Sequence, residues 1–185
     1  MESAIEYKLV TFEHLVASHQ DLKVFKPDVP SGWYYLGPLA VSDNKSNQEG
    51  MIVRATAEGT LADVVDWERI GPKNTGPQSS FSAWRGIGPD GYVVMGDFFT
   101  EGDEKPTSEQ TVGIKAVRED LVRSLQVQRL IWEGRQQESV LTLWDVVAVP
   151  LIFVFPQTFL ASNEHDPGET KASVFLFNVL RHRDW

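Results

Sequence analysis

The 185-residue sequence contains no cysteine. A disulfide framework, thiolate chemistry and a cysteine-ligated zinc site are therefore excluded. The absence fits a reducing compartment.

Positive charge is scarce. Seventeen Lys and Arg residues stand against 26 Asp and Glu residues, which gives a formal net charge of −9, and no basic cluster interrupts this background. Because such a surface repels a phosphate backbone, we do not expect nucleic acid as a partner.

Long apolar runs are also missing. The longest, residues 146–155, is broken by Pro150 and has about half the length of a membrane-spanning helix. The first residues, Met1 to Lys8, lack the basic start and apolar core of a signal peptide. We therefore expect a leaderless, cytoplasmic protein without a transmembrane segment, and leave non-classical release open.

Motifs for catalysis are absent too. The sequence has no Gly-x-Ser-x-Gly, no His-Glu-x-x-His and no Gly-rich phosphate loop. His165 has acidic neighbours only within its own loop, and His14 and His19 have no partner at metal-ligand spacing. We predict that the protein is not an enzyme and uses no cofactor and no metal.

The sequence does contain an internal repeat. Residues 30–37 (PSGWYYLG) return as residues 89–96 (PDGYVVMG), with proline, Gly at +2, an aromatic residue at +3, Leu or Met at +6 and Gly at +7. A third copy begins at Pro150 and keeps Phe153 at the aromatic position, but has Ile152 and Gln157 where the glycines stood. Near-equal spacings of this kind indicate one supersecondary unit used three times.

Two further features follow the same period. One is an aromatic residue five or six positions before each proline, namely Phe25, Trp84 and Trp144. The other is a polar loop about twelve residues after each proline, at 42–50, 101–107 and 162–170.

Many short strand-like runs between Gly and Pro turns predict an all-β fold. The threefold repeat favours a β-prism-like arrangement of three small antiparallel sheets. A β-trefoil is the alternative, although its unit is usually shorter than this period. We expect a single domain over residues 1–185, with repeats at approximately 25–70, 84–133 and 144–180. Residues 118–124 have an open alternative as one turn of helix.

Equivalent offsets place the three polar loops at one end of a threefold fold. Their side chains are of the kind that hydrogen-bond sugar hydroxyls or, when they converge, ligate calcium. The simpler interpretation is that hairpin tips are polar for solubility. The candidate ligand-binding residues in these loops are Asp43, Asn44, Asn47, Asp103, Glu104, Asn163 and Asp166.

The signature aromatic residues have two interpretations. Trp33, Tyr92 and Phe153 suit ligand stacking, but aromatic residues held by a glycine turn are more often core residues. Gly32, Gly37, Gly91 and Gly96 are explained most simply by turn and bulge geometry.

The central signature resembles that of the vacuolar protein sorting-associated protein 62 family of fungi and plants. It comprises Trp84, residues 88–96, Lys105-Pro106 and residues 115–121. The likeness extends over most of residues 25–177, although Ala116 stands where the family often has cysteine and residues 133–138 replace a Gly/Ser-rich segment. The resemblance implies a link to vacuolar trafficking and brings no catalytic residues with it.

Two functional hypotheses follow. The first is a non-catalytic, lectin-like module that binds a glycan or a membrane headgroup through the loops at one end. The second is a cytosolic protein-interaction module that docks a protein partner in vacuolar protein sorting.

Overall fold

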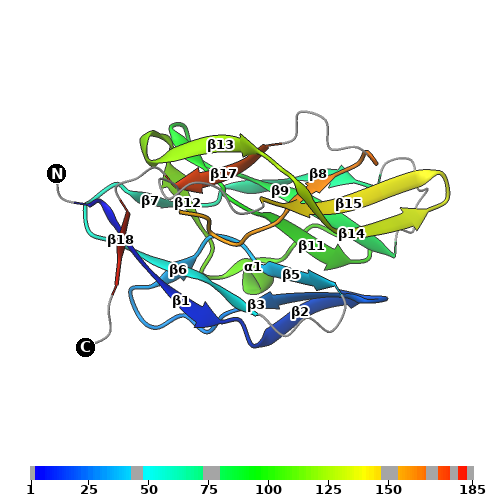
Figure 1. Ribbon diagram of the computed structural model, residues 1–185, viewed down its shortest axis with the longest axis horizontal. Helices are drawn as coiled ribbons and strands as arrows, with labels where there is room; N and C mark the ends of the chain where they lie inside the picture. Colours follow the sequence, from blue (N-terminus) through cyan, green and yellow to red (C-terminus); the bar gives the residue numbers. More distant parts are fainter. Residues whose placement is uncertain are drawn as a thin grey trace.

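The computed structural model describes residues 3–42, 48–72, 80–146, 154–165, 171–175 and 179–182. Strands dominate these residues (Figure 1), and the helical segments among them are α1 (Ser108–Thr111) and the 3-10 helix η1 (Glu119–Leu121). The predicted all-β fold is confirmed. Neither helix in this part of the chain has the length or apolar content to cross a membrane.

The strands form three successive units of the same plan, and a last strand, β18 (Val179–Arg181), follows them. Unit 1 (residues 5–55) contains β1 (Ile5–Thr11), β2 (His14–His19), β3 (Leu22–Lys26), β4 (Tyr34–Tyr35), β5 (Leu39–Ser42) and β6 (Glu49–Ala55). Unit 2 (residues 61–118) contains β7 (Leu61–Asp63), β8 (Asp66–Gly71), β9 (Phe81–Ile87), β10 (Tyr92–Val93), β11 (Asp97–Glu101) and β12 (Lys115–Arg118). Unit 3 (residues 122–175) contains β13 (Val122–Gln126), β14 (Arg129–Gln136), β15 (Ser139–Asp145), β16 (Leu160–Ser162) and β17 (Lys171–Phe175).

Strand pairing is the same in each unit. We number six strand positions in each unit; in unit 3 the described residues form no strand at the fourth position, so β16 and β17 hold the fifth and sixth. The first strand pairs with the sixth, and in units 1 and 2 the sixth pairs with the fourth, in the orders β1-β6-β4, β7-β12-β10 and β13-β17. In unit 3 a single bridge, Val154 to Phe175, takes the place of the fourth strand. The second, third and fifth strands form the meanders β2-β3-β5, β8-β9-β11 and β14-β15-β16. The repeating order of strand pairs thus starts at β1, β7 and β13, whereas the predicted repeats start at residues 25, 84 and 144.

The described strands make six small sheets, not the three that the sequence predicted. Each unit divides into two sheets at the point where the chain passes from its first strand to its second. Only two residues separate these strands, at 12–13, 64–65 and 127–128. The chain turns away at each break, and a freed backbone N–H finds another acceptor. Phe12 donates to Gln48 at 2.8 Å, Val65 to Ile87 at 2.8 Å and Gln128 to Asp145 at 3.0 Å, all through backbone atoms.

Each meander carries a β-bulge at the same place. Register shifts fall between Leu15 and Ala17, between Arg69 and Gly71, and between Leu130 and Trp132. A bulge of this kind bends its strand and re-aims side chains. The last residues that pair before each bulge are Leu15, Arg69 and Leu130, and they face Phe25, Trp84 and Trp144. The three predicted repeat aromatics therefore occupy equivalent positions.

The Pro-x-Gly signature forms the same turn twice. The Trp33 N–H donates to the Pro30 carbonyl and the Tyr92 N–H to the Pro89 carbonyl, each at 3.0 Å. Gly32 and Gly91, at the third position of these turns, have φ angles of 81° and 83°. A type II turn requires positive φ at this position, which explains both glycines.

The second glycine of the signature has a different role. A Cβ atom added to Gly96 would lie 2.7 Å from Cβ of Thr158 and 3.3 Å from Cα of Gly37. Residues from all three units therefore meet at one point, and Thr158 is the third member. This corrects the predicted alignment of the third copy, which put Gln157 at the glycine position.

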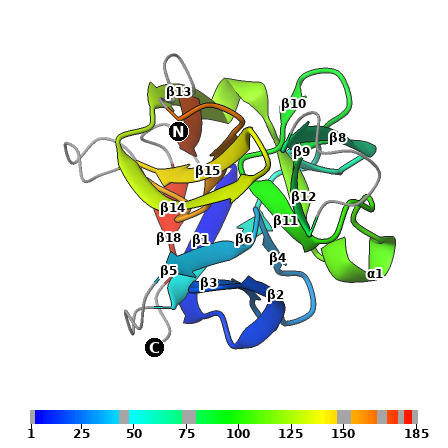
Figure 2. The same ribbon diagram turned by 90° about the vertical axis from the view of Figure 1, so that its right-hand side faces the viewer.

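Two buried clusters lie along the long axis of the molecule. The three meanders enclose one, which includes Leu22, Phe81, Phe99, Trp132 and Leu143. The sheets built on β1, β7 and β13 enclose the other, which includes Leu36, Met51, Met95, Val117 and Phe175. Viewed along this axis, the three meanders surround a common centre (Figure 2).

Candidate functional site

The described starts of the three polar loops lie at the same end of the molecule. Ser42 pairs with Leu22, Glu101 with Phe81 and Ser162 with Thr142. The first two loops thus leave their sheets opposite the first residue of the third strand, and the last leaves opposite the middle of β15. We call this end of the molecule the hairpin end (right in Figure 1). Units 1 and 2 contact each other there, because the Ser18 backbone N–H donates to Oε1 of Glu101 at 3.4 Å.

The structure describes three of the seven predicted ligand-binding residues. Glu104 is exposed, and Asp103 and Asn163 are half-buried. Hydrogen bonds to their loop fix the backbone, since Arg69 donates to the Asp103 carbonyl at 3.5 Å and Thr100 to the Glu104 carbonyl at 3.3 Å. The other four, Asp43, Asn44, Asn47 and Asp166, lie outside the described residues.

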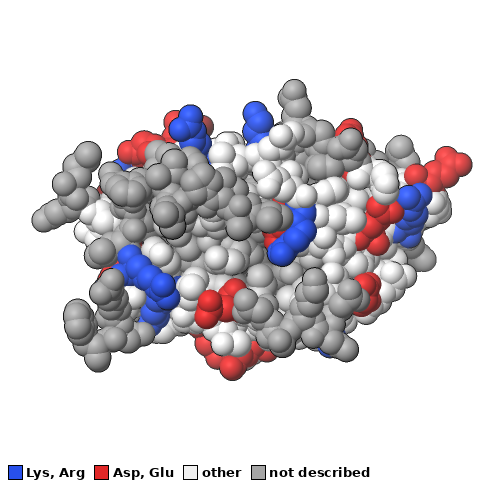
Figure 3. Space-filling view, in the orientation of Figure 1, with Lys and Arg blue, Asp and Glu red and all other residues white. Residues whose placement is uncertain are grey.

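No cluster of His, Cys, Asp and Glu suited to a metal ion occurs in the described part of the chain. On the face in Figure 3, basic and acidic side chains are intermixed and no large area has one sign.

The histidines have partners that the sequence did not reveal. His165 contacts Glu133 of β14 at 2.6 Å, across its own unit and not within its loop. His14 lies 2.7 Å from Asp28. The ring of His19, from unit 1, lies 4.7 Å from the ring of Phe81 in unit 2 and 5.9 Å from that of Trp132 in unit 3. His19 thus covers the core at the hairpin end.

The first signature aromatic residue is covered. Trp33 is 6% exposed, and Lys8 and Arg54 lie over its ring at 4.7 and 4.9 Å from the centroid. Tyr92 is half-buried and donates its hydroxyl hydrogen to the Gly59 carbonyl. Trp33 is therefore a core residue, as the simpler interpretation held, and Phe153 lies outside the described residues.

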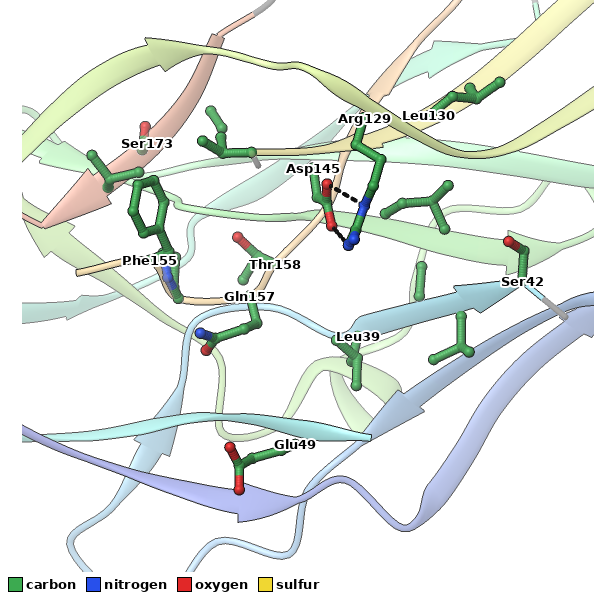
Figure 4. A pocket seen from close by; sticks show the side chains of 17 residues that line it. Leu39, Ser42, Glu49, Arg129, Leu130, Asp145, Phe155, Gln157, Thr158 and Ser173 are labelled. Carbon is green, nitrogen blue, oxygen red and sulfur yellow. Dashed lines mark hydrogen bonds and ion pairs between the residues drawn. The ribbon is translucent and has the colours of Figure 1, made fainter. Parts of the chain in front are cut away.

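A groove opens between unit 3 and unit 1, where β14 packs against β5. Its volume is about 550 Å³. Figure 4 shows Arg129 and Asp145 on one wall, Leu39 and Gln157 across from them, and Phe155 near Ser173 at one side. Ser42 and Glu49, which belong to the first polar loop (42–50), also line the groove.

Arg129 and Asp145 are the charged pair of this groove. They face each other at the open ends of β14 and β15, and Nε of Arg129 donates to Oδ1 of Asp145 at 3.0 Å, beside a second contact from Nη2. The Asp145 side chain is 18% exposed and that of Arg129 63%. Burial raises the pKa of Asp145, and the Arg129 guanidinium opposes this effect.

Sequence reasoning missed the groove entirely. Arg129 and Asp145 are 16 positions apart and belong to no motif. The feature of the sequence that could have indicated it is the weak third copy of the repeat. A unit that has lost the signature is expected to contact its neighbour differently from the other two units.

Comparisons with known proteins support the fold. The family model described as vacuolar protein sorting-associated protein 62 matches residues 4–150. The crystal structure of GNIP1Aa from Chromobacterium piscinae is similar, with a TM-score of 0.72 and 20% sequence identity over 90% of this chain. The match covers 34% of the GNIP1Aa chain, so the present chain corresponds to about a third of that protein. No curated protein sequence matches.

Proposed function

The chain belongs to the vacuolar protein sorting-associated protein 62 family, and we propose that it is a non-catalytic binding module that holds a glycan at the hairpin end. The observation that carries this proposal is that the described first residues of the three polar loops lie at the same end of the molecule. Ser42 and Glu101 each start a loop opposite the first residue of the unit's third strand, and Ser162 starts its loop opposite Thr142, in the middle of β15.

The chemistry of the loops supports a sugar ligand. Asp, Asn, Glu and Ser side chains accept and donate hydrogen bonds to hydroxyl groups. Glu104 projects into solvent and Asp103 is half-exposed, while hydrogen bonds from Arg69 and Thr100 hold their backbone. A fixed backbone with accessible polar side chains reduces the entropy lost on binding.

A glycan array and liposome flotation, each with and without calcium, test the proposal. We expect retention of a glycan, and Asp103→Ala and Asn163→Ala should weaken it. Both variants should keep their stability within about 0.5 kcal/mol, because loop side chains that are partly exposed contribute little to folding. Glu58→Ala is the matched control, since Glu58 is an exposed acidic residue in the connection between β6 and β7.

Three outcomes separate the possibilities. Glycan binding that depends on Asp103 and Asn163 supports the proposal. Flotation with anionic or neutral liposomes, without glycan binding, replaces the sugar by a lipid headgroup. No binding in either format contradicts the proposal.

A protein-docking role in trafficking is the second candidate. The observation that favours it is an exposed apolar pair, Val65 and Ile87, which are 62% and 41% exposed. They are neighbours, because the Val65 N–H donates to the Ile87 carbonyl at 2.8 Å. A stoichiometric protein captured from a cytoplasmic extract, and lost with the double variant Val65→Ser/Ile87→Ser, would favour docking.

A further inference from the structure

The three contacts between units follow one plan. The second strand of each unit packs against the fifth strand of another, in the pairs β2 with β11, β8 with β16 and β14 with β5. Because the register of every meander is known, the residues at the three contacts can be compared position by position.

At the contact between units 2 and 3, charged groups bridge the boundary. Arg85 binds the buried Asp97 through Nε at 3.2 Å and Nη2 at 3.0 Å. Both residues then reach across to Ala161 of unit 3, since its N–H donates to Asp97 at 2.7 Å and its carbonyl accepts from Arg85 at 3.2 Å.

At the contact between units 1 and 2, aromatic rings occupy the boundary. Phe98 of β11 is fully buried and clusters with Phe25, Trp33 and Trp67. Phe98 faces Trp84 across its sheet, as Leu39 faces Phe25 in unit 1. Leu39 therefore holds the position of Phe98 at the contact between units 3 and 1.

Among the described residues, the contact between units 3 and 1 has neither a charged bridge like Arg85–Asp97 nor a buried aromatic ring like Phe98. Asp145 stands at the position of Arg85, and the residue opposite it, at the position of Asp97, is the apolar Phe159. Phe159 turns into the core enclosed by the meanders. Asp145 consequently pairs with Arg129 of its own hairpin, and the space beside Leu39 stays open as the groove of about 550 Å³.

The lining of the groove fits a neutral sugar. A carboxylate such as Asp145 accepts two neighbouring hydroxyl groups, and a guanidinium such as Arg129 donates to hydroxyl oxygens. Leu39, Leu130 and Phe155 provide apolar surface for the C–H face of a sugar ring. An anionic ligand fits less well, because Glu49 and Asp145 outnumber Arg129 among the charged lining residues and the chain carries −9.

We propose that the groove between units 3 and 1 is a subsite for a neutral hexose, read by the Arg129–Asp145 pair. The inference rests on the proposed function in that the ligand class is a glycan. It adds a contact at the boundary between two units to the contacts proposed for the three loops.

Titration of the ¹⁵N-labelled protein with methyl α-mannoside, methyl α-glucoside and methyl β-galactoside, followed by NMR, tests the site. We expect at least one sugar to shift the amides of Ala40, Ser42, Leu130 and Ser173. Asp145→Asn should weaken this binding at least tenfold, and N-acetylneuraminic acid should not bind. Lys26→Ala is the matched control, because Lys26 holds the position of Asp145 in unit 1.

A second variant fills the groove without removing a polar group. Leu39→Phe introduces the side chain that unit 2 has at this position, and we expect it to abolish sugar binding while the melting temperature is unchanged or higher. Absence of groove shifts with all three sugars, or full binding by both Leu39→Phe and Asp145→Asn, overturns the inference. Sugar-dependent shifts confined to Asp103, Glu104 and Asn163 would overturn it and leave the proposed function standing, whereas a blank glycan array would overturn both.

Discussion

Gly37 and Gly96 face each other across the meeting point of the three units. A Cβ atom on Gly37 would lie 3.1 Å from Cα of Gly96, and one on Gly96 would lie 2.8 Å from Cγ2 of Thr158. The Thr158 hydroxyl donates to the Met95 carbonyl at 2.9 Å. The Thr158 side chain of unit 3 thus fills the space that is left open because units 1 and 2 have glycine at this position.

This arrangement predicts coupling between positions 96 and 158. Gly96→Ala should cost about 1–3 kcal/mol of unfolding free energy, because the new methyl group overlaps Thr158. Adding Thr158→Gly should recover part of that loss, although Thr158→Gly alone is itself destabilising. Urea unfolding of the four proteins measures the interaction energy. Strictly additive effects would contradict contact between the two side chains.

A second prediction concerns the buried acid of unit 2. Asp97 is 1% exposed; burial raises its pKa, against the effects of Arg85 and the Ala161 N–H. Asp97→Asn should cost about 1–3 kcal/mol, because it removes a charge-assisted hydrogen bond of Arg85, whose side chain is 47% exposed and keeps contact with water.

Two controls separate charge from packing at this site. The double variant Arg85→Met/Asp97→Asn should be no more destabilised than Asp97→Asn, since it keeps an acceptor for the Ala161 N–H and leaves no unpaired charge. Asp120→Asn breaks a surface pair with Arg118 at 2.6 Å and should leave the stability almost unchanged, because water screens exposed ion pairs. Equal losses for Asp97→Asn and Asp120→Asn in chemical denaturation would refute the assignment.

The third prediction is a pH dependence at the last strand. His182 contacts Glu6 of β1, and this hydrogen bond, helped by Arg54 and opposed by partial burial, holds the pKa of Glu6 below its usual value of 4.5. A carboxyl group with a lowered pKa in the folded state stabilises that state above its unfolded pKa, and this stabilisation is lost as the pH falls through the folded pKa.

The stability difference between wild type and Glu6→Gln should therefore be largest near neutral pH and shrink below about pH 4. Unfolding free energies near neutral pH and below about pH 4 check it, and amide exchange of His182, whose N–H donates to the Tyr7 carbonyl, reports on the attachment of β18 directly. A difference that stays constant with pH would show that Glu6 acts through packing alone.

The signature aromatics give the fourth prediction. Trp33 is buried under Lys8 and Arg54, so Trp33→Ala should cost about 3–5 kcal/mol. Tyr92 is only half-buried, and Tyr92→Phe should cost about 1 kcal/mol through the lost hydrogen bond to Gly59. Thermal melts compare the two, and a Trp33→Ala variant that melts like wild type would contradict a core role.

Much of the fold was predictable because its signals are local. Gly32 and Gly91 mark turns that only a few residues define, and Phe25 and Trp84 keep the same spacing from those turns. The split into six sheets was not predictable, since breaks such as Phe12–Glu13 carry no Gly or Pro. The third copy was misplaced by one residue because Thr158 replaces a glycine, and only its contact with Gly96 identifies it.

The groove was beyond sequence reasoning for a related reason. Its existence depends on what stands at equivalent positions in different units, such as Leu39 against Phe98 and Asp145 against Arg85. Those equivalences come from strand register, which a single sequence does not supply once a bulge shifts it. The predicted loop residues Asp103, Glu104 and Asn163 lie where expected relative to their strands, but their role in binding stays a prediction.

The parallel pairing of β18 with β1 joins Ile5 to Val179 and Tyr7 to Arg181, and both strands lie opposite the hairpin end (Figure 1). An affinity tag or a surface linker joined to either chain end would therefore emerge on the same side of the molecule. A protein immobilised in this way would stand upright on a sensor, with its hairpin end directed into the flowing solution. Reversing the tag from one chain end to the other should leave the measured glycan response unchanged.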